Sequence, residues 1–398
     1  MAIKPLAIAA CTLTNALGRG LAASLRALRE GESGLRPCDF EDAELNTWIG
    51  QVAGLDQEPL RGELAPFDCR NNRLARLGLE QDGFGAAVRQ ARDRYGADRI
   101  GVFIGTSTSG IGATEHAYRQ RDPITGSLPA TFDYQHTHNV FSVADFTRRW
   151  LGLTGVAFAI STACSSSAKA FASAWRQMRG GLCDAAVVGG VDSLCLTTLH
   201  GFNALGLISA RPCRPWDVDR DGLNIGEAAG FALLEWAKPN DDRVLLLGYG
   251  ESSDAYHMTA AHPEGAGAAL AMQEALARAE ILPAQVDYIN LHGTATPLND
   301  AAEDRAVLRV FGPATPCSST KGWTGHTLGA AGVTEAVFVA LCLEQDLIPG
   351  TLNTRRRDPR LGAGVVLENR ERPLRLALSN SFGFGGTNCS LLLGRRRR

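Results

Sequence analysis

Short apolar runs alternate along the chain with amphipathic or small-residue segments, and this alternation restricts the fold more than any other feature. Within each run apolar residues follow one another without polar interruption, which is typical of strands buried on both faces of a sheet. We expect strands at residues 99–105, 156–161, 184–190, 243–250, 286–293 and 374–381. A strong amphipathic pattern predicts a helix over 266–281. Elements in this order predict a layered α/β architecture.

The chain also repeats itself weakly. Residues 102–110 (VFIGTSTSG) and 289–297 (INLHGTATP) each place Gly-Thr-x-Thr directly after an apolar run. Two further pairs of segments continue the echo: 161–170 with 325–336, and 187–193 with 382–388. Two similar α/β halves explain both this echo and the length of 398 residues. Because a proline and a charged stretch break the pattern over 235–244, we expect halves at 1–238 and 239–398.

Composition argues against several classes of protein. The formal net charge is −2, so no overall positive field favours nucleic acid. The one basic run, Arg395–Arg398, is expected to be a solvated tail. No apolar run approaches about 18 residues, so we expect no membrane span. The ten cysteines are scattered without zinc spacing, and no secretory signal is convincing. We therefore expect free thiols, no metal and a cytoplasmic location.

Cys164 stands where an apolar strand gives way to a helix, in the segment AISTACSSSAKAFASAW (159–175). The free N–H groups of a helix's first turn and its dipole favour a thiolate, which is the nucleophilic form of cysteine. The small neighbours of Cys164 would let a long acyl or pantetheine substrate approach the backbone. The alternative for any cysteine is a buried small hydrophobe, and we expect that of Cys11, Cys195 and Cys342.

Two histidines occupy strand-exit or helix-entry loops. His292 lies in LHGTAT and His326 in KGWTGHTLGAAG, with Lys321 close by in sequence. A cysteine with histidines could form a hydrolase site, but a thiol protease needs one histidine and an orienting Asn or Asp. Two histidines and a lysine suit the stabilisation of negative charge beside a thioester carbonyl. We expect the other histidines, such as His116 and His200, to be surface or core fillers.

Four ordered blocks resemble the signature blocks of β-ketoacyl-[acyl carrier protein] synthases. They are TACSSS, HGTATPLND, STKGWTGHTLGAAG and NSFGFGGTN, and RPWDVDRDGLNIGEAAG (214–230) is similar to a further family segment. The similarity covers nearly the whole chain and is greatest to the elongating type I/II branch. It implies a thiolase-like αβαβα fold of two similar halves.

The resemblance implies a role for five site residues. Cys164 would accept the acyl group, His292 and His326 would drive malonyl decarboxylation, and Lys321 would be their supporting cation. Phe384 would be the gate between acyl and malonyl binding, with its N–H joining that of Cys164 in the oxyanion hole.

Five further residues follow from the same resemblance. Thr294 and Thr296 would bind the phosphopantetheine arm, and Ile111 would lie along the acyl channel. Glu335 and Asn388 would be structural polar groups behind the site. The resemblance implies no metal and no cofactor of the chain's own, because the carrier protein delivers phosphopantetheine.

The implied partners are an acyl carrier protein and its acyl and malonyl thioesters, within a homodimer or a heterodimer with a related subunit. Carrier proteins of this type are acidic, so we expect a local basic patch. Arg70, Arg73 and Arg76 in 67–81 would form neighbouring steps along one helix face. At Gly206 some relatives carry a basic residue that contacts the carrier protein.

Two other functions remain open on the residues. A coenzyme A thiolase of this fold places a second cysteine late in the chain, and Cys389 could be read so. A non-catalytic chain-length factor looks like this fold with the nucleophile replaced, whereas Cys164 is present here. The short link over 233–250 differs from many housekeeping relatives and leaves room for polyketide or polyene assembly besides fatty-acid synthesis.

Overall fold

A computed structural model describes residues 2–396, so Arg397 and Arg398 of the expected basic tail lie outside the described residues. The strands of the first half lie side by side in the order β1-β9-β7-β5-β6. Their bounds are β1 Leu6–Asn15, β9 Ala228–Trp236, β7 Ala185–Asp192, β5 Ile100–Gly105 and β6 Ala157–Ile160. The first two pairings are antiparallel, and the pairings of β7 with β5 and of β5 with β6 are parallel.

The second half repeats this pattern strand by strand. Its order is β10-β17-β16-β11-β12, again with two antiparallel pairings followed by two parallel ones. Their bounds are β10 Val244–Ser253, β17 Thr387–Arg395, β16 Leu376–Gly383, β11 Tyr288–Asn290 and β12 Pro316–Ser318, with β14 Gly364–Val365 beyond β12. The repeated segments therefore lie on equivalent strands, since 102–110 begins within β5 and 289–297 begins within β11, and each continues into the loop after its strand. A short antiparallel pairing of β1 with β10 joins the two halves into one sheet.

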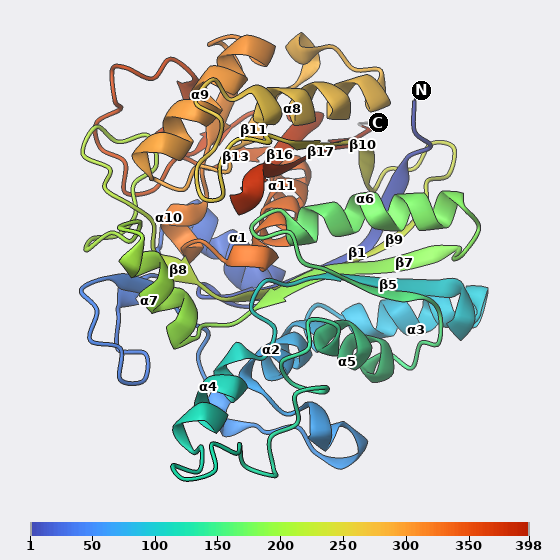
Figure 1. Ribbon diagram of the computed structural model, residues 1–398. Helices are drawn as coiled ribbons and strands as arrows, with labels where there is room; N and C mark the ends of the chain where they lie inside the picture. Colours follow the sequence, from blue (N-terminus) through green and yellow to red (C-terminus); the bar gives the residue numbers. More distant parts are fainter. Residues whose placement is uncertain (1, 397–398) are drawn as a thin grey trace.

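Helices form three layers around these strands (Figure 1). The central layer consists of α6 (Ser166–Arg179) and α11 (Ala331–Gln345), which pack against each other between the halves. One outer layer, below β5 in Figure 1, consists of α2 Arg70–Leu79, α3 Phe84–Tyr95 and α5 Ser142–Trp150. The other consists of α8 Ala266–Ala279 and α9 Pro297–Phe311. These layers confirm the predicted αβαβα fold.

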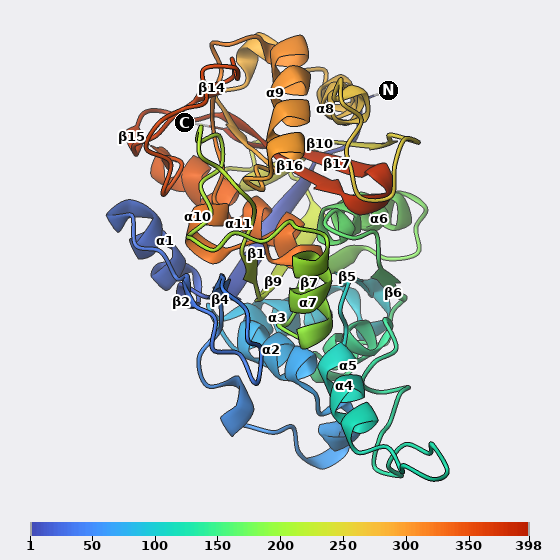
Figure 2. The ribbon, with the colours of Figure 1, turned by 60° about the vertical axis from the view of Figure 1, so that its left-hand side comes forward.

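Shorter elements connect the layers (Figure 2). The remaining helices are α1 Leu21–Glu30, α4 Ile111–Arg119, α7 Leu196–Ala204 and α10 Lys321–Thr324. The remaining strands are β2 Gly18–Arg19, β3 Arg36–Pro37, β4 Trp48–Gly50, β8 Ile225–Gly226, β13 Leu347–Ile348 and β15 Arg370–Glu371. Turns of 3₁₀ helix lie at Leu55–Gln57, Gly62–Phe67, Ala97–Arg99, Pro283–Gln285, Leu328–Ala330 and Phe384–Gly386. The boundary expected between residues 238 and 239 falls in the loop between β9 and β10. The division of the chain into two domains there stays a prediction.

The central helices approach each other unusually closely. A Cβ atom at Gly332 of α11 would come within 2.4 Å of the backbone N of Ala168 in α6. Only glycine fits there, because no real Cβ is found so near a backbone atom. The two halves therefore pack closely against each other through α6 and α11.

One stretch of helix, Leu328–Gln345, is long and apolar enough to cross a membrane by length and composition alone. This corrects the expectation that no apolar run approaches that length. The stretch is mostly buried inside the protein between the two halves. A helix covered on every side is apolar all round, which is the physical reason for its composition.

Candidate active site

A strained turn presents Cys164. The residue follows β6 by four positions and precedes Ser166, the first residue of α6. Ala163 adopts the left-handed conformation with φ 51°, which is uncommon for a residue with a Cβ and is often found at functional sites. The side chain of Ser166 donates to the Ala163 carbonyl at 2.6 Å and holds this turn in place.

Burial has the largest effect on the pKa of the Cys164 thiol. Cys164 is buried, and burial raises its pKa to about 11, although the Lys321 ammonium and the N–H of Phe384 act in the opposite direction. The expectation that a helix N-terminus keeps Cys164 as a thiolate is therefore wrong. Desolvation of the charge exceeds the effect of the dipole. To act as a nucleophile, this thiol would have to lose its proton to a neighbouring base.

His326 is placed to take that proton. Its Nε2 lies 2.9 Å from Cys164 Sγ. Backbone pairing fixes the ring's position, because His326 N–H donates to the Asn224 carbonyl at 2.7 Å and its own carbonyl accepts from Gly226 at 2.9 Å. Burial, followed by the charge of Lys321, lowers the pKa of His326 well below its ordinary value, so the ring is neutral at neutral pH.

His292 enters the same site from the end of β11. Both carboxylate oxygens of Glu303 accept backbone hydrogen bonds there, from His292 and Gly293, at 2.8 Å each. Burial first, and then Lys321 and His326, lower the pKa of His292 well below its ordinary value. The two histidine rings meet edge to face with centroids 5.3 Å apart.

Lys321 lies behind His292 and sets its tautomer. Its Nζ lies 3.4 Å from His292 Nδ1, donates to the His292 carbonyl and pairs with Glu335. A lysine ammonium can only donate, so Nδ1 is an acceptor and the ring proton stands on Nε2. Burial raises the pKa of Glu335 to about 7, against the effect of Lys321. Glu335 contacts Lys321 on the side away from the pocket lining, and its role as a structural polar group stays a prediction.

Phe384 covers the thiol from the turn between β16 and β17. Its backbone N–H points at Cys164 Sγ, and its half-buried ring stacks on Phe202 of α7. Asn388 donates to Asp254 Oδ1 at 2.7 Å, and Asp254 N–H donates to the Gly386 carbonyl at 2.8 Å. The Phe384 turn is therefore tied to the segment around Asp254.

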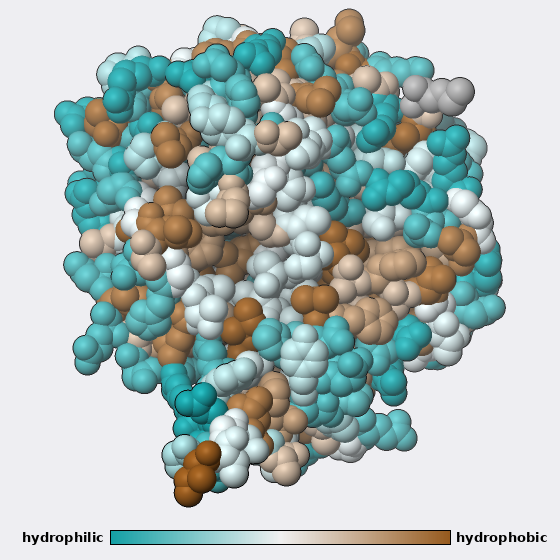
Figure 3. Space-filling view, in the orientation of Figure 1, coloured by the Kyte–Doolittle hydropathy of each residue, from teal (hydrophilic) through white to brown (hydrophobic). Residues whose placement is uncertain are grey.

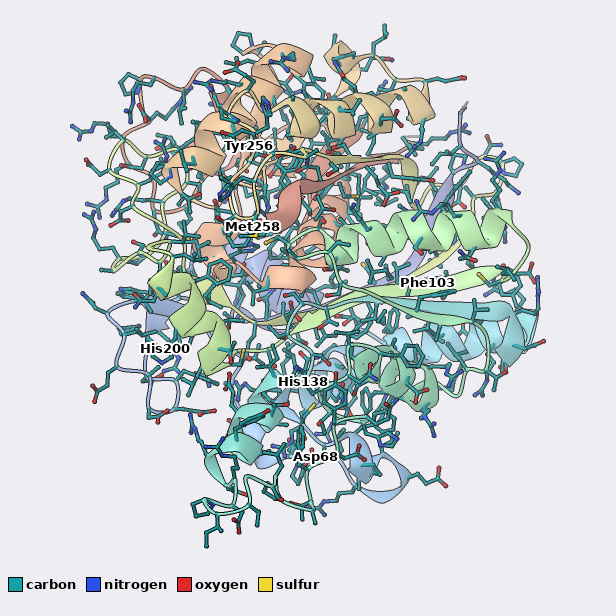
Figure 4. All side chains as sticks on the ribbon, in the orientation of Figure 1. Asp68, Phe103, His138, His200, Tyr256 and Met258 are labelled. Carbon is teal, nitrogen blue, oxygen red and sulfur yellow. The ribbon has the colours of Figure 1, made fainter. Side chains whose placement is uncertain are left out.

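A pocket of about 210 Å³ brings most of the predicted residues together. Cys164, His292, His326, Thr294, Thr296, Phe384 and Asn388 all line it. Thr294 and Thr296 share a hydrogen bond between their hydroxyls at 2.9 Å. Figure 3, in the orientation of Figure 1, shows apolar side chains around a hollow near the centre of the view. Figure 4 labels Met258 and His200 in the same orientation.

Ile111 is not brought into this pocket. It begins α4 and is half-buried, outside the residues that line the cavity. Its assignment to an acyl channel stays a prediction. His116 and His200, expected to be fillers, are both exposed, and neither lines the pocket.

Sequence reasoning missed three residues that shape the site. Phe202 supports Phe384, Asp254 holds the segment opposite it, and Glu303 fixes the backbone at His292. Only Glu303 left a signal, because it follows His292 by eleven residues, just beyond the HGTATPLND block. The contact of Phe202 with Phe384 crosses between the two halves, and Asp254 meets Asn388 and Gly386 from more than 130 residues away in sequence.

Three side chains of the site also have the spacing of a metal centre. The ligand atoms of Cys164, His292 and His326 lie within 4.8 Å of one another. Among residues 2–396 no further histidine, cysteine or carboxylate joins this group, and the sequence expectation of a metal-free site stays a prediction. Metal analysis of the purified protein would test it.

The other cysteines behave as buried small residues. All ten are free, and Cys11 and Cys38 are the two that are only half-buried. Burial raises the pKa of Cys11, Cys195 and Cys342 to about 12. The prediction that Cys195 and Cys342 fill the core is confirmed, and Cys11 lies at its margin.

The structure contradicts the expected carrier-docking helix. Residues 70–79 do form α2, but the arginine side chains are only 12% (Arg70), 20% (Arg73) and 14% (Arg76) exposed. Each pairs with a carboxylate: Arg70 with Glu227 and Asp56, Arg73 with Asp68, and Arg76 with Glu58 and Glu80. Paired, mostly buried arginines present little positive potential to a partner, so this face is not a basic patch.

Comparison with known sequences identifies two family regions. The family described as Beta-ketoacyl synthase, N-terminal domain, matches residues 4–240. Beta-ketoacyl synthase, C-terminal domain, matches residues 244–355.

Curated relatives agree over nearly the whole chain. The 3-oxoacyl-[acyl-carrier-protein] synthase 2 of Vibrio cholerae is 34% identical over 95% of this chain and 96% of that protein. The mitochondrial 3-oxoacyl-[acyl-carrier-protein] synthase of Arabidopsis thaliana is 33% identical over 94% of this chain and 90% of its own.

Solved structures agree as well. A ketosynthase from Xenorhabdus doucetiae, determined in complex with its chain length factor, is 38% identical with a TM-score of 0.89. That comparison covers 99% of this chain and 98% of the other. The ishigamide ketosynthase/chain length factor is 26% identical with a TM-score of 0.89, over the full length of both chains.

Proposed function

Because this chain belongs to the β-ketoacyl synthase family and is an acyltransferase, we propose that it condenses an acyl group held on Cys164 with a malonyl thioester. The observation that carries the proposal is one pocket that holds Cys164 Sγ 2.9 Å from His326 Nε2 with His292 beside them. A nucleophile, a base and a second ring donor at one point suit this reaction.

In the first half-reaction the Cys164 thiol gives its proton to Nε2 of His326 while Sγ attacks the carbonyl carbon of an acyl thioester. The N–H groups of Cys164 and Phe384 donate to the oxyanion of the tetrahedral intermediate. Collapse breaks the original C–S bond, and the departing pantetheine thiolate takes the proton from His326. The acyl group remains on Cys164, and His326 is neutral again.

In the second half-reaction a malonyl thioester loses its carboxylate as carbon dioxide, and the electron pair stays behind as an enolate. The enolate oxygen accepts hydrogen bonds from the rings of His292 and His326. Nδ1 of His326 has no hydrogen-bond partner among residues 2–396, so either tautomer is open to this ring. It can accept in the first step and donate in the second.

Bond formation completes the cycle. The enolate carbon attacks the acyl carbonyl, and the C–S bond to Cys164 breaks. The product is a β-ketoacyl thioester two carbons longer, and the released thiolate takes up a proton. Thr294 and Thr296 line the pocket where the pantetheine arm would bind. The arm arrives with the carrier protein, and we propose that the chain needs no cofactor of its own and acts in the cytoplasm.

A second thiolase-like subunit is the proposed structural partner. Strand β6 lies at the edge of the sheet, and the apolar side chain of Phe158 on it is exposed. Exposed apolar edge strands are sites at which another strand adds. Tyr118, Tyr134 and Val140 are also exposed in the N-terminal half. The partner is a second copy or, as for the 38% identical ketosynthase, a chain length factor.

Two alternative functions lack support. A thiolase would need a second reactive cysteine, but Cys389 is buried in β17, does not line the pocket, and burial raises its pKa. A purely structural subunit would not need Cys164, His292 and His326 in contact. A pathway in polyketide or polyene assembly is favoured by the two ketosynthases solved with, or named with, chain length factors.

The test is condensation with purified components. The protein is incubated with acyl- and malonyl-carrier protein, alone and with any co-purifying homologue, and products are measured by mass spectrometry. A β-ketoacyl thioester two carbons longer, absent with Cys164→Ala, is expected. If intact protein acquires no acyl group on Cys164 from any acyl-carrier protein, the proposal is wrong.

A further inference from the structure

We propose that Asp192 is a positioning residue, which holds His326 against Cys164 by tying the turn after His326 to the loop after β5. Asp192 is the last residue of β7 in the first half, and His326 belongs to the second half. The side chain of Asp192 does not line the Cys164 pocket, so its effect on the reaction passes through other residues. The inference rests on the proposed function, because the role of His326 as a base belongs to that function.

The carboxylate of Asp192 is fully buried and surrounded by hydrogen-bond donors. Oδ1 accepts from the Thr106 hydroxyl at 2.6 Å, from Ser107 N–H at 2.9 Å, and from the N–H and hydroxyl of Thr108 at 3.0 and 2.9 Å. Oδ2 accepts from the Ser107 hydroxyl at 2.5 Å, from Ser107 N–H at 3.0 Å and from Gly329 N–H at 2.6 Å. A buried charge is costly unless it is paired or hydrogen-bonded in this way. The backbone N–H groups among these donors cannot reverse their role, so both oxygens must accept.

The hydrogen bond from Gly329 supports the turn that follows His326. Gly329 lies three residues after His326, in the 3₁₀ turn that leads into α11. Leu328 adopts the left-handed conformation with φ 53°, which is uncommon for a residue with a Cβ. A Cβ atom at Gly329 would lie 2.7 Å from Asp192 Oδ2 and equally close to the backbone of the loop after β5, so only glycine permits this approach. Asp192 therefore supports one side of the His326 loop, and the backbone bridge to β8 supports the other.

The same carboxylate holds a loop on the side of the nucleophile. Thr106, Ser107 and Thr108 form this loop directly after β5. Thr106 N–H donates at 3.1 Å to the carbonyl of Ile160, the last residue of β6, and Cys164 follows Ile160 by four positions. Figure 1 shows β5 and β7 next to each other below α6. One side chain thus joins the loop beside the nucleophile to the turn behind the base.

The charge of Asp192 also acts on Cys164. Burial raises the pKa of the thiol most, and the Asp192 carboxylate raises it further. Loss of the charge should therefore make Cys164 easier to ionise, whereas loss of the hydrogen-bond geometry should impair transfer of its proton to His326. A role in the stability of the fold alone predicts no slower acyl transfer in a variant that stays folded. The two readings can therefore be separated by experiment.

The variant Asp192→Asn keeps the shape of the side chain and removes its charge. An amide has one oxygen and one amino group, and in either orientation the amino group meets a backbone N–H donor. Asp304→Asn is the matched control, because Asp304 is also buried and accepts from the backbone N–H groups of Gly362 and Ala363, at 3.1 and 2.8 Å, away from the pocket. Gly329→Ala is a second variant, which crowds the same contact from the other side and keeps the charge.

Three quantities are measured for each protein: thermal unfolding, the rate and KM of acyl transfer to Cys164, and the ionisation of its thiol. Acyl transfer is followed by rapid quench and mass spectrometry of the intact protein. Thiolate formation is followed by ultraviolet absorbance as the pH is raised, as the difference from the same protein carrying Cys164→Ala. This last measurement needs no substrate.

For Asp192→Asn we expect acyl transfer at saturating thioester to slow roughly ten- to hundredfold, because a small displacement of the base is costly. The KM should change little, since Asp192 does not line the pocket. The thiol should titrate at a lower pH than in wild type. Gly329→Ala should slow acyl transfer without that shift, and Asp304→Asn should behave as wild type in both measurements.

Acyl transfer in folded Asp192→Asn as fast as in Asp304→Asn would overturn the proposal, as would a slowing that only follows the loss of folded protein. If Asp192→Asn does not fold, Gly329→Ala decides: slower acyl transfer supports the positioning role, and an unchanged rate rejects it. A wild type that transfers no acyl group to Cys164 rejects the proposed function itself, which is a different result from an active wild type with an equally active Asp192→Asn.

Discussion

Phe202 of α7 stacks on Phe384 with ring centroids 5.5 Å apart and an angle of 18° between the ring planes. One ring belongs to the first half of the molecule and the other to the turn that covers the thiol. Because the backbone N–H of Phe384 points at Cys164, the stack also holds this N–H, the proposed oxyanion donor, in position. Any movement of Phe384 that opens the pocket must first separate these rings.

Phe202→Ala is therefore expected to loosen the Phe384 turn. An aromatic pair contributes about 0.5–1.5 kcal/mol beyond its buried area, so the closed turn loses up to roughly tenfold in population. Rapid-quench measurement of acyl transfer to Cys164 should show a slower first half-reaction. Phe202→Leu, which keeps apolar bulk without the stack, is the matched control. An unchanged rate of acyl transfer in Phe202→Ala would show that the Phe202–Phe384 stack does not contribute to this step.

Cys164→Ala should abolish condensation while leaving the fold intact, since a small buried residue replaces another. Labelling of the thiol should be followed in a Cys38→Ser background, because Cys38 is half-buried and competes for the reagent. Mass spectrometry after limited treatment with iodoacetamide should locate most of the label on Cys164. Label spread evenly over several cysteines would contradict an accessible, His326-assisted thiol.

Substitutions of the two histidines should have different effects when the two half-reactions are measured separately. His292→Ala removes a donor to the enolate, which typically costs about 10²–10³ in rate, and should spare acylation of Cys164. His326→Ala should damage both half-reactions, because His326 Nε2 is the group in contact with Sγ. Carbon dioxide release from malonyl-carrier protein and acyl-enzyme formation give the two readouts. Equal acylation defects in both variants would refute this division.

The pH dependence of alkylation follows from the raised pKa of Cys164, about 11. The thiol is protonated below that value, so its thiolate fraction rises about tenfold per pH unit from pH 7 to pH 10. The alkylation rate should increase over this whole range without a plateau. A plateau beginning near neutral pH would mean that the thiolate is paired with a protonated His326 in the resting protein.

Acid should destabilise the folded protein through the buried histidines. The folded-state pKa values of His292 and His326 are lowered, so their contribution to stability is present above the unfolded value of about 6.5 and is lost as pH falls below it. Buried carboxyls with raised pKa values, such as Glu335 at about 7, act in the opposite direction over the same range, so the quantity to measure is the difference in unfolding free energy between wild type and His292→Gln. In urea unfolding between pH 5 and pH 8, wild type should lose stability relative to His292→Gln toward the acid end. A difference that stays constant over this range would argue against a neutral buried ring.

The strands that could be predicted from the sequence are those with unbroken apolar runs. Six segments were expected to be strands, and each contains all or most of one strand of the sheet. In chain order these strands are β5, β6, β7, β10, the short β11 and β16. Strands β1, β9 and β17 were not predicted, although all three are mostly buried. Two threonines in β1 and asparagine and serine in β17 interrupt the apolar character of those strands. Strand β9 carries an unbroken apolar run before Glu235, and the prediction overlooked it.

At the site, motif order predicted Cys164, His292, His326 and Lys321, but not what burial does to them. The raised pKa of Cys164 depends on how much protein surrounds Sγ, which no spacing encodes. The arginines of α2 were misread for a related reason. The partner of Arg70, Glu227, stands 157 residues away in sequence, so its neutralising contact exists only in the fold.

The close approach of Gly332 to Ala168 has a consequence for how the activity could arise. Cys164 belongs to one half, and His292, His326, Lys321 and Phe384 belong to the other, so neither half alone holds the proposed nucleophile together with its proposed base. The proposed active site therefore exists only while the two halves pack against each other at α6 and α11. The contact that holds α6 against α11 therefore also holds the proposed nucleophile against its proposed base.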